Sequence, residues 1–303
     1  MRQGTVIRAA GGFFAVSDGD GRGYLCRARG LLKREKASLM VGDRVLFVPP
    51  QDDQSGSKTD STIISSGVGV IEELIPRTNR LSRPLVANVD QLVIVMSLKN
   101  PPCDWQLVSR LLILAESEEL AAVLCLNKVD LLTREELKDV AGMIEPYPYP
   151  VYYTSAVNGD GIESLQEQLV GFCSVFAGPS GVGKSSLLNA IQPGLNLKEG
   201  PVSDKIKRGR HTTRQAELLL LDGGGTVVDT PGFSRLDFTG LKPEQLPGLF
   251  PEFDSFLGLC AFRNCMHLAE PDCAVQQQVG DTLNAMRYGH YKYFMTELLQ
   301  QQR

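Results

Sequence analysis

The stretch that most constrains this chain is residues 175–190, which reads VFAGPSGVGKSSLLNA. Its first three residues are apolar and predict a buried strand, and the residues from Ser186 onward predict a helix. Between strand and helix the pattern G-x-x-x-x-G-K-S runs from Gly178 to Ser185. A strand, a glycine-rich turn and a helix in this order predict a phosphate-binding loop.

The residue types of this loop suit a polyphosphate. Gly178 and Gly183 let the backbone curl so that successive N–H groups point at one anion, and the helix N-terminus adds partial positive charge. Lys184 can reach the β- and γ-phosphates, and the Ser185 hydroxyl can ligate Mg²⁺. A chance glycine turn is the alternative, which the lysine and hydroxyl disfavour. The candidate contact residues are Gly178, Pro179, Ser180, Gly181, Val182, Gly183, Lys184, Ser185 and Ser186.

A second strand-and-loop unit, residues 120–130, indicates which base is bound. It reads LAAVLCLNKVD, an apolar run that ends in a polar loop. Asp130 can accept two hydrogen bonds from guanine, at the ring N–H and the exocyclic amine, a pair that adenine does not offer. The stem of Lys128 can lie along the base, and Asn127 can tie this loop to the phosphate loop. Beside a phosphate loop, NKVD therefore predicts guanine specificity.

Two further strand ends complete the predicted nucleotide site. The run VYYTSA at 151–156 ends in Ser155 and Ala156, and the backbone N–H of Ala156 can bond the guanine O6. The run TVVDTPG at 226–232 supplies Asp229, suited to Mg²⁺ through a water molecule, and Gly232, which can sense the γ-phosphate. These are the motifs of a GTPase.

The order of these motifs is unusual, because NKVD and TSA precede the phosphate loop instead of following it. A circularly permuted G domain explains the order. Permutation is physically tolerable, since chain termini often lie close together and a compact sheet does not depend on where the chain is cut. Alternating strands and helices predict a mostly parallel sheet covered on both faces, with the sites at the carboxyl ends of its strands.

Length and composition limit the other possibilities. At 303 residues the chain predicts two or three domains, and 43% hydrophobic with 22% charged residues is ordinary for a globular protein. No run approaches the roughly 20 apolar residues of a membrane span, and the first 16 residues lack a signal-peptide core. Seven cysteines in such a chain favour reduced thiols and a cytoplasmic location. A net charge of −4 does not favour nucleic-acid binding in general, so RNA contact must depend on local patches and no DNA binding is expected.

The first 75 residues predict a small β-barrel of the oligonucleotide-binding (OB) kind. Short β-rich runs alternate with Gly, Asp and Ser, at 5–7, 12–16, 23–26 and 43–48. A basic patch accompanies them, formed by Arg27, Arg29, Lys33, Arg34 and Lys36. Contact with RNA phosphates and a merely solvated loop explain this patch equally well.

Residues 198–214, between the phosphate-loop helix and the next strand, are basic and show no apolar periodicity. Their position predicts a switch loop, in which Thr213, or else Thr212, meets Mg²⁺ and the γ-phosphate. Phe233 follows Gly232 where a water-orienting glutamine often stands, so intrinsic hydrolysis is predicted to be slow and completed by a partner. His211 is a candidate replacement, and a surface or RNA-contacting histidine is the equal alternative.

The C-terminal region carries a predicted metal site. Cys260-x4-Cys265-x-His267-x5-Cys273 places three thiols and an imidazole within a short stretch. This ligand set suits tetrahedral Zn²⁺, and four protein ligands leave no open position, which favours a structural ion. Ordinary thiols are the alternative, disfavoured because the stretch has few large apolar residues to form a core. Residues 276–299 are predicted to form one helix, with Val279, Leu283, Met286 and Tyr293 on one face.

The motifs GPSGVGKSS, GRHTT, DTPGF, NKVD and C-x4-C-x-H-x5-C together resemble those of the bacterial ribosome-small-subunit-dependent GTPases, a family of circularly permuted GTPases. The resemblance covers essentially the whole chain. It implies a multidomain fold with an OB-like barrel, a central α/β P-loop GTPase of permuted order and a mainly helical zinc module. The expected divisions are an OB-like barrel at 1–75, a linker at 76–84, the GTPase domain at 85–240 and the zinc module at 241–303.

The resemblance also implies activity and partners. It implies GTP hydrolysis to GDP and phosphate stimulated by the small (30S) ribosomal subunit, contact with 16S rRNA and a role in late subunit maturation. One alternative is an RNA-binding protein that uses GTP as a structural or regulatory ligand with little turnover. An autonomous small-molecule NTPase or kinase is a further alternative, which Phe233 disfavours. A monomer is expected, because no heptad seam argues for self-association.

Overall fold

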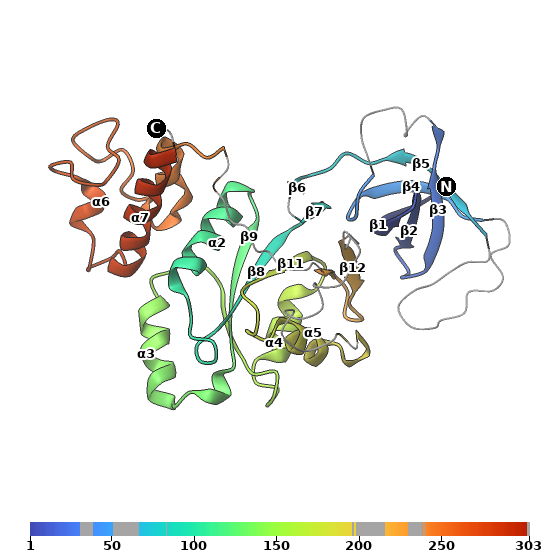
Figure 1. Cartoon of the computed structure of the whole chain (residues 1–303), viewed down its shortest axis with the longest axis horizontal. Coiled ribbons are helices and arrows are strands. Elements are labelled where there is room, and N and C mark those ends of the chain that lie inside the picture. The colour runs from blue at the N-terminus through green and yellow to red at the C-terminus, as the bar shows by residue number, and fades with distance from the viewer. Residues whose placement is uncertain are drawn as a thin grey trace, which may run out of the picture.

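The structure is a computed structural model that describes residues 1–30, 39–50, 67–82, 84–195, 197, 216–229, 238 and 240–301. A β-barrel, a central α/β unit and a helical C-terminal module follow one another along its long axis (Figure 1). The predicted fold class is thereby confirmed. Among the described residues, no helix is both long and apolar enough to cross a membrane.

The N-terminal barrel is built from five strands, in the order β1-β2-β3-β5-β4, and the pairing of β4 with β1 closes it. Its core contains Val6, Val16, Phe47 and Ile71, and buried residues alternate with less buried ones along β1, β4 and β5. The sequence predicted four of these strands and missed the fifth. The strands are β1 (Arg2–Ala10), β2 (Phe13–Asp18), β3 (Gly23–Ala28), β4 (Arg44–Val48) and β5 (Gly69–Leu74).

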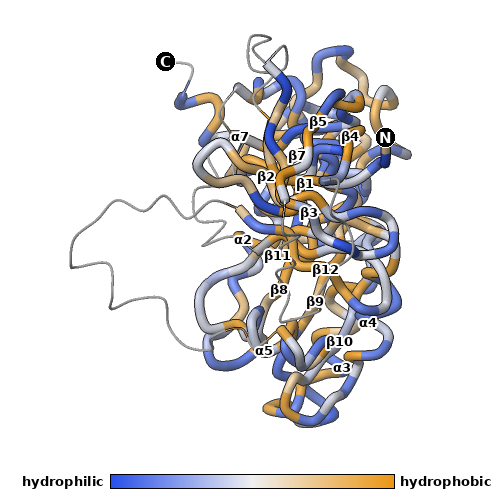
Figure 2. The backbone as a smooth tube through the Cα atoms, turned by 90° about the vertical axis from the view of Figure 1, so that its right-hand side faces the viewer, coloured by the Kyte–Doolittle hydropathy of each residue, from blue (hydrophilic) through white to orange (hydrophobic). Residues whose placement is uncertain are grey.

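The central sheet has the order β10-β9-β8-β11-β13-β12, parallel except for the antiparallel strand β12. All seven residues of β8 are buried, as expected for a strand covered on both faces. In Figure 2 the hydrophobic segments gather along these central strands. The strands are β8 (Gln91–Ser97), β9 (Ala121–Asn127), β10 (Val151–Thr154), β11 (Cys173–Ala177), β12 (Glu217–Leu220) and β13 (Thr226–Asp229).

Helices cover both faces of this sheet. Leu92 and Ile94 of β8 pack with residues of α2 (Trp105–Ser117), and α3 (Arg134–Ile144) contributes to the same cluster. The alternate residue Val93 packs in a second cluster with α4 (Ile162–Leu169) and α5 (Lys184–Ile191). Because successive strand residues point to opposite faces, one apolar strand fills both cores. Two short 3₁₀ helices, η1 (Val129–Leu131) and η2 (Pro193–Leu195), lie in the connecting loops.

A short antiparallel pair, β6 (Arg80–Ser82) and β7 (Leu85–Ala87), connects the barrel to the central unit. The amide of Asn88 donates to the carbonyl of Gly42 over 2.8 Å, and the backbone N–H of Ala87 donates to Val41 over 2.9 Å. The guanidinium of Arg77 also makes two hydrogen bonds, of 2.6 and 2.9 Å, to the fully buried carboxylate of Asp43. We call this set of contacts the barrel base.

The C-terminal module contains η3 (Pro243–Leu249), η4 (Pro251–Phe253), α6 (Ala274–Gln277) and α7 (Ala285–Gln301). The predicted single helix over 276–299 is therefore wrong. Gly280 adopts a φ of 90°, which a right-handed helix does not allow, and its N–H bonds to the carbonyl of Leu283 instead. Tyr293 is 52% exposed and does not lie on the inner face, whereas Leu283 is buried.

The module packs on α2 of the central unit. Ile113 of α2 belongs to the core cluster of the module together with Phe294 of α7. Arg110 of α2 makes a bidentate ion pair with Glu297, at 3.0 and 2.5 Å. The Ser109 hydroxyl lies 2.8 Å from Nδ1 of His290. Helix α2 thus joins the two cores, since Leu111 and Leu112 on its other side belong to the core of the central sheet.

Candidate functional site

The phosphate loop connects the end of β11 at Ala177 to the start of α5 at Lys184. Gly178 has a φ of 146°, and a Cβ there would lie 2.1 Å from the carbonyl oxygen of Val95. Gly183 has a φ of 97°, and its Cβ would lie 2.4 Å from the Asn127 amide. Side chains are therefore excluded at both positions, and the loop closes tightly over the ends of two neighbouring strands.

Lys184 occupies the first turn of α5, where the unpaired N–H groups of the helix begin. Its ammonium donates to the carbonyls of Gly178 and Pro179, at 2.7 and 2.9 Å. Burial lowers the pKa of this ammonium below its ordinary value. The charge is thus held at the mouth of the loop, where helix dipole and backbone N–H groups favour an anion.

The base-recognition loop follows β9. Asn127, the last residue of that strand, is 1% exposed, and its amide donates to the carbonyl of Val182 in the phosphate loop over 2.8 Å. The tie between the two loops that the sequence predicted is therefore present. Lys128 lies next to it in the left-handed region, and its ammonium donates to the carbonyl of Gly181 over 2.6 Å and also to that of Asn100.

Asp130 is exposed and lies in η1, directly after these two residues. One of its carboxylate oxygens accepts a hydrogen bond of 2.6 Å from the hydroxyl of Ser155, which is itself fully buried. Ser155 is fixed in turn, because its backbone N–H bonds to the carbonyl of Asp160. Ala156 follows at the same strand end and is partly exposed. The structure thus brings together the NKVD and TSA residues that the sequence singled out.

Two residues of this site were not predicted. The hydroxyl of Thr154, fully buried at the end of β10, donates to Oδ1 of Asn127 over 3.2 Å, which leaves the Asn127 amide N–H₂ facing the phosphate loop. Asn100 supplies a carbonyl to Lys128 from the loop after β8. Thr154 is part of the TSA motif, but the sequence predicted no contact for it. No sequence signal near Asn100 indicated its contact with Lys128, because that contact depends on β8 and β9 being neighbours in the sheet.

Several predicted residues lie outside the described part of the chain. They are His211, Thr212 and Thr213 of the predicted switch loop, Gly232 and Phe233 of the DTPGF motif, and Lys33, Arg34 and Lys36 of the basic patch. The backbone of Asp229 is described and ends β13 beside the phosphate-loop strand. Arg27 and Arg29 are also described. Arg27 lies over the Phe13 ring at 4.3 Å, and Arg29 pairs with Glu72 at 2.5 Å.

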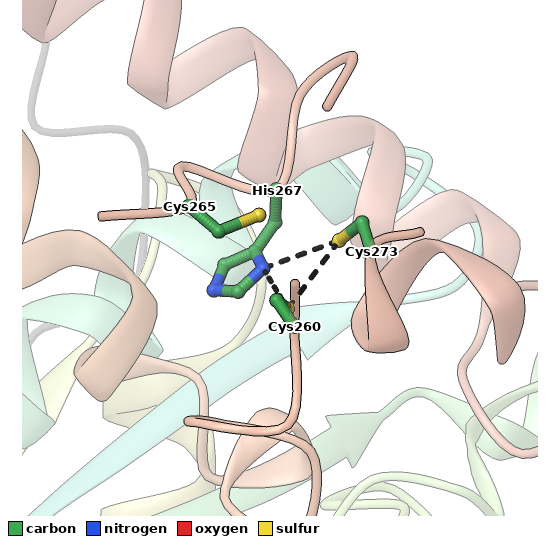
Figure 3. A group of neighbouring side chains, drawn as sticks. All are labelled: Cys260, Cys265, His267 and Cys273. Carbon is green, nitrogen blue, oxygen red and sulfur yellow. Dashed lines mark hydrogen bonds between the residues drawn. The ribbon is translucent and has the colours of Figure 1, made fainter. Parts of the chain in front are cut away.

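The candidate metal site consists of four side chains of the C-terminal module that lie close together (Figure 3). The ligand atoms of Cys260, Cys265, His267 and Cys273 all lie within 4.8 Å of one another. The imidazole Nδ1 is 3.3 Å from the thiol of Cys273 and 3.5 Å from that of Cys260, and these two thiols are 3.9 Å apart.

These distances fit tetrahedral zinc. Zn–S and Zn–N bonds of about 2.3 and 2.0 Å imply S···S and S···N separations of about 3.8 and 3.5 Å. Burial lowers the pKa of His267, which favours the neutral imidazole that binds metal. Tyr288 and Tyr291 of α7 donate to the carbonyls of His267 and Met266, at 2.8 and 2.5 Å. The helix therefore supports the ligand loop directly.

Together, the motif order on a parallel sheet, the barrel and the metal-ligand cluster define a circularly permuted GTPase with an OB-like barrel and a C-terminal module. Family comparisons identify it further. The sequence model of the RsgA GTPase matches residues 74–239, and that of the RsgA N-terminal domain matches residues 3–57. The chain belongs to the RsgA GTPase family.

Relatives and solved structures agree over the full length. The chain is 44% identical to the small ribosomal subunit biogenesis GTPase RsgA of Moorella thermoacetica, with 99% of each chain covered. It is 42% identical to the protein of the same name from Geobacillus kaustophilus, with 98% of each covered. The crystal structure of YjeQ from Thermotoga maritima matches with a TM-score of 0.83 and 39% identity, covering 98% of both chains. That of YloQ, a circularly permuted GTPase, matches with a TM-score of 0.80 and 36% identity, covering 99% of this chain and 96% of that one.

Proposed function

We propose that this GTPase binds the small ribosomal subunit and hydrolyses GTP when the subunit stimulates it, during late 30S maturation. The observation that carries the nucleotide part is the hydrogen bond from Asn127 to Val182, which joins the base-recognition loop to the phosphate loop. The ribosomal part is supported by the curated relatives, which are named small ribosomal subunit biogenesis GTPases. The nucleotide site and the resemblance to ribosomal factors concern the same chain, because the Moorella relative matches 99% of it.

In this proposal the phosphate loop, Gly178 to Ser186, binds the phosphates through its backbone N–H groups and Lys184. Asp130 selects guanine, with Ser155 holding its carboxylate, and Ala156 contacts the base oxygen. Ser185 and, through water, Asp229 would hold Mg²⁺, which supplies positive charge to the β- and γ-phosphate oxygens. GTP and GDP are thus substrate and product at the carboxyl ends of β9, β10, β11 and β13.

The hydrolytic step is proposed to need the ribosomal partner. Phe233 has no polar group to orient water, so the unassisted protein turns over slowly. We assign Thr213 to Mg²⁺ and γ-phosphate binding, Gly232 to γ-phosphate sensing and His211 to the orientation of the attacking water. Contact with the small subunit completes the hydrolytic site in the proposed mechanism.

The Cys260, Cys265, His267 and Cys273 group is proposed to hold one structural Zn²⁺, since four protein ligands leave no open coordination position. We further propose a cytoplasmic monomer that contacts 16S rRNA and no DNA or membrane. The proposed division is an OB-like barrel at 1–75, a linker at 76–84, a GTPase domain at 85–240 and a zinc module at 241–303.

GTP turnover tests the proposal. Phosphate release is measured for the purified protein alone, with isolated small subunits and with large subunits as the control. Strong stimulation by small subunits only is the expected result. Equal rates in all three samples would contradict a ribosome-stimulated GTPase. If the protein binds small subunits and GTP but turnover stays negligible, the chain is an RNA-binding protein that uses GTP as a structural ligand.

A further inference from the structure

Strand β1 belongs to two sheets at once. It is the first strand of the barrel, paired with β2 and β4, and it also pairs with β12 of the central sheet. The second pairing is short, since the register among the described residues joins the strands at Arg8 and Glu217 alone. We call this contact the β1–β12 seam. It makes the barrel a continuation of the nucleotide-binding sheet.

The register of the seam leads directly to the nucleotide site. Glu217 is opposite Arg8 on one side and opposite Asp229 on the other. Position 229 is the one proposed to hold Mg²⁺, so a single row of the sheet connects that position to the barrel. Glu217 also follows closely, along the chain, on Thr213, which the proposed function assigns to Mg²⁺ and the γ-phosphate. A change at position 229 or at Thr213 therefore reaches β12 before it reaches the barrel.

The side chains at the seam make it specific but weak. Arg8 and Glu217 carry opposite charges at directly opposed positions, where Cβ atoms lie about 5 Å apart. Arg8 is exposed, and opposite charges at exposed positions attract each other only weakly in water. Ile7, at an irregularity in the β1–β2 register, packs with Ala9 against the cluster that contains Leu218. One residue pair and a small apolar contact can form and break readily.

The barrel base, by contrast, is strongly fixed. Its Asp43 carboxylate is fully buried and paired with Arg77, and its Val41 is 3% exposed within the core cluster of the central unit. The barrel is therefore held firmly at the barrel base and weakly at the β1–β12 seam. The angle between the barrel and the nucleotide site depends on the seam.

We propose that the β1–β12 seam is a nucleotide-responsive contact that sets the angle of the barrel. The occupancy of position 229 and of the γ-phosphate site changes the position of Glu217, and Arg8 transmits that change to the barrel. This inference depends on the proposed nucleotide site. It implies that the angle of the barrel differs between the GDP-bound and the GTP-bound protein.

Hydrogen–deuterium exchange of the full-length protein tests the seam, with saturating GDP and with a non-hydrolysable GTP analogue, each with Mg²⁺. Binding of both is verified in the same samples by displacement of a fluorescent guanine nucleotide. We expect peptides that cover 5–12 and 216–221 to exchange at rates that differ by about fivefold, the lower end of typical coupling between sites. Peptides that cover 23–28, in β3 away from the seam, should exchange equally in both states.

Charge variants test the residues. Arg8→Glu places like charges opposite each other and should speed exchange at the seam severalfold in both nucleotide states. The double variant Arg8→Glu/Glu217→Arg restores the opposite charges and should return exchange towards the wild-type rate. Arg22→Glu makes the same charge change at an exposed barrel position outside the seam, and it should leave seam exchange unchanged.

The outcomes separate the two proposals. Failure of the protein to bind either nucleotide would overturn the proposed function and, with it, the seam. Binding of both nucleotides with identical exchange at 5–12 and 216–221 would overturn the seam alone. A nucleotide-dependent difference that Arg8→Glu alters no more than Arg22→Glu does would overturn the transmitting role of Arg8.

Discussion

The Ser155 hydroxyl donates a 2.6 Å hydrogen bond to Oδ1 of Asp130 from a position 25 residues further along the chain. The bond fixes one carboxylate oxygen of an exposed side chain that would otherwise rotate freely. An oriented carboxylate can accept two parallel hydrogen bonds from guanine without first losing rotational freedom. In the proposed nucleotide site, base recognition thus depends on two strand ends, those of β9 and β10, and not on the NKVD loop alone.

Asp130→Asn should change the base that is bound. Asparagine replaces one acceptor oxygen with an N–H₂ donor, so one hydrogen bond to guanine is lost and the other loses its charge. Each hydrogen bond to a charged group stabilises by about 1.5–3 kcal/mol, so GDP affinity should fall about a hundredfold. Xanthosine diphosphate, which has an oxygen in place of the exocyclic amine, should bind the variant better than GDP. Calorimetric titration with both nucleotides measures this, and unchanged GDP preference would contradict the assignment of Asp130.

Asn127→Ala should weaken nucleotide binding and stability together. The substitution leaves the Val182 carbonyl without its partner, and it leaves the buried Thr154 hydroxyl with only the Cys125 thiol, at 3.3 Å, at a cost of about 1–3 kcal/mol. Chemical denaturation should therefore show a lower free energy of unfolding, and GDP affinity should drop because the phosphate loop loses its tie. Asn264→Ala, at an exposed position in the C-terminal module, is the matched control and should change neither quantity.

Removal of the proposed Zn²⁺ should destabilise the C-terminal module. The four proposed ligands lie on a loop whose carbonyls accept hydrogen bonds from Tyr288 and Tyr291, so the proposed Zn²⁺ would stabilise both the loop and its packing on α7. Elemental analysis should find about one zinc ion per chain, and Cys273→Ser should reduce that content. Nucleotide affinity should remain close to wild type, since the phosphate loop makes no part of this cluster. Full zinc content in the variant would contradict the proposed ligand set.

Arg287→Met should destabilise the protein strongly. Arg287 is 1% exposed, bonds to Glu252 over 2.6 Å and lies over the Phe250 ring at 4.2 Å. Loss of one partner of a buried pair costs about 3–5 kcal/mol, because the other charge is left unpaired. The double variant Arg287→Met/Glu252→Gln should recover part of that loss. Arg263→Met, at an exposed position in the same module, is the control, and equal denaturation midpoints for Arg287→Met and Arg263→Met would rule out a stabilising role for the buried pair.

Glu116→Gln should stabilise the protein at neutral pH. Burial raises the pKa of Glu116, and the nearby Glu252 raises it further, while the nearby Tyr149 hydroxyl opposes the shift. A raised pKa means that the folded protein binds the proton more tightly than the unfolded chain does. The stabilisation is thus present at low pH and lost as pH rises through the folded-state pKa. Thermal unfolding at pH 4 and pH 7 should show a higher Tm for the variant at pH 7 only. A constant difference at both pH values would contradict the assignment.

Much of the fold could be predicted because its signals are local. Helix α3 is one example, because its first turn is fixed by a capping box of Thr133 with Glu136, two residues only three positions apart. The C-terminal helix was placed wrongly because apolar spacing continues across Gly280, whose φ of 90° only the folded chain reveals. Strand β5 was missed because its burial depends on the barrel that it helps to close.

The chemistry of this protein can be predicted from its residues alone, because the phosphate loop, NKVD and the Cys–His cluster are sets of residue types at fixed spacing. Which of these groups meet is a property of the folded chain. The bonds from Asn127 to Val182 and from Ser155 to Asp130 exist because parallel strands bring their carboxyl ends to one edge of the sheet. The pairing of Arg8 with Glu217 likewise depends on how two domains dock. Such contacts join residues far apart in the chain, and only the packing of the sheet sets their distance.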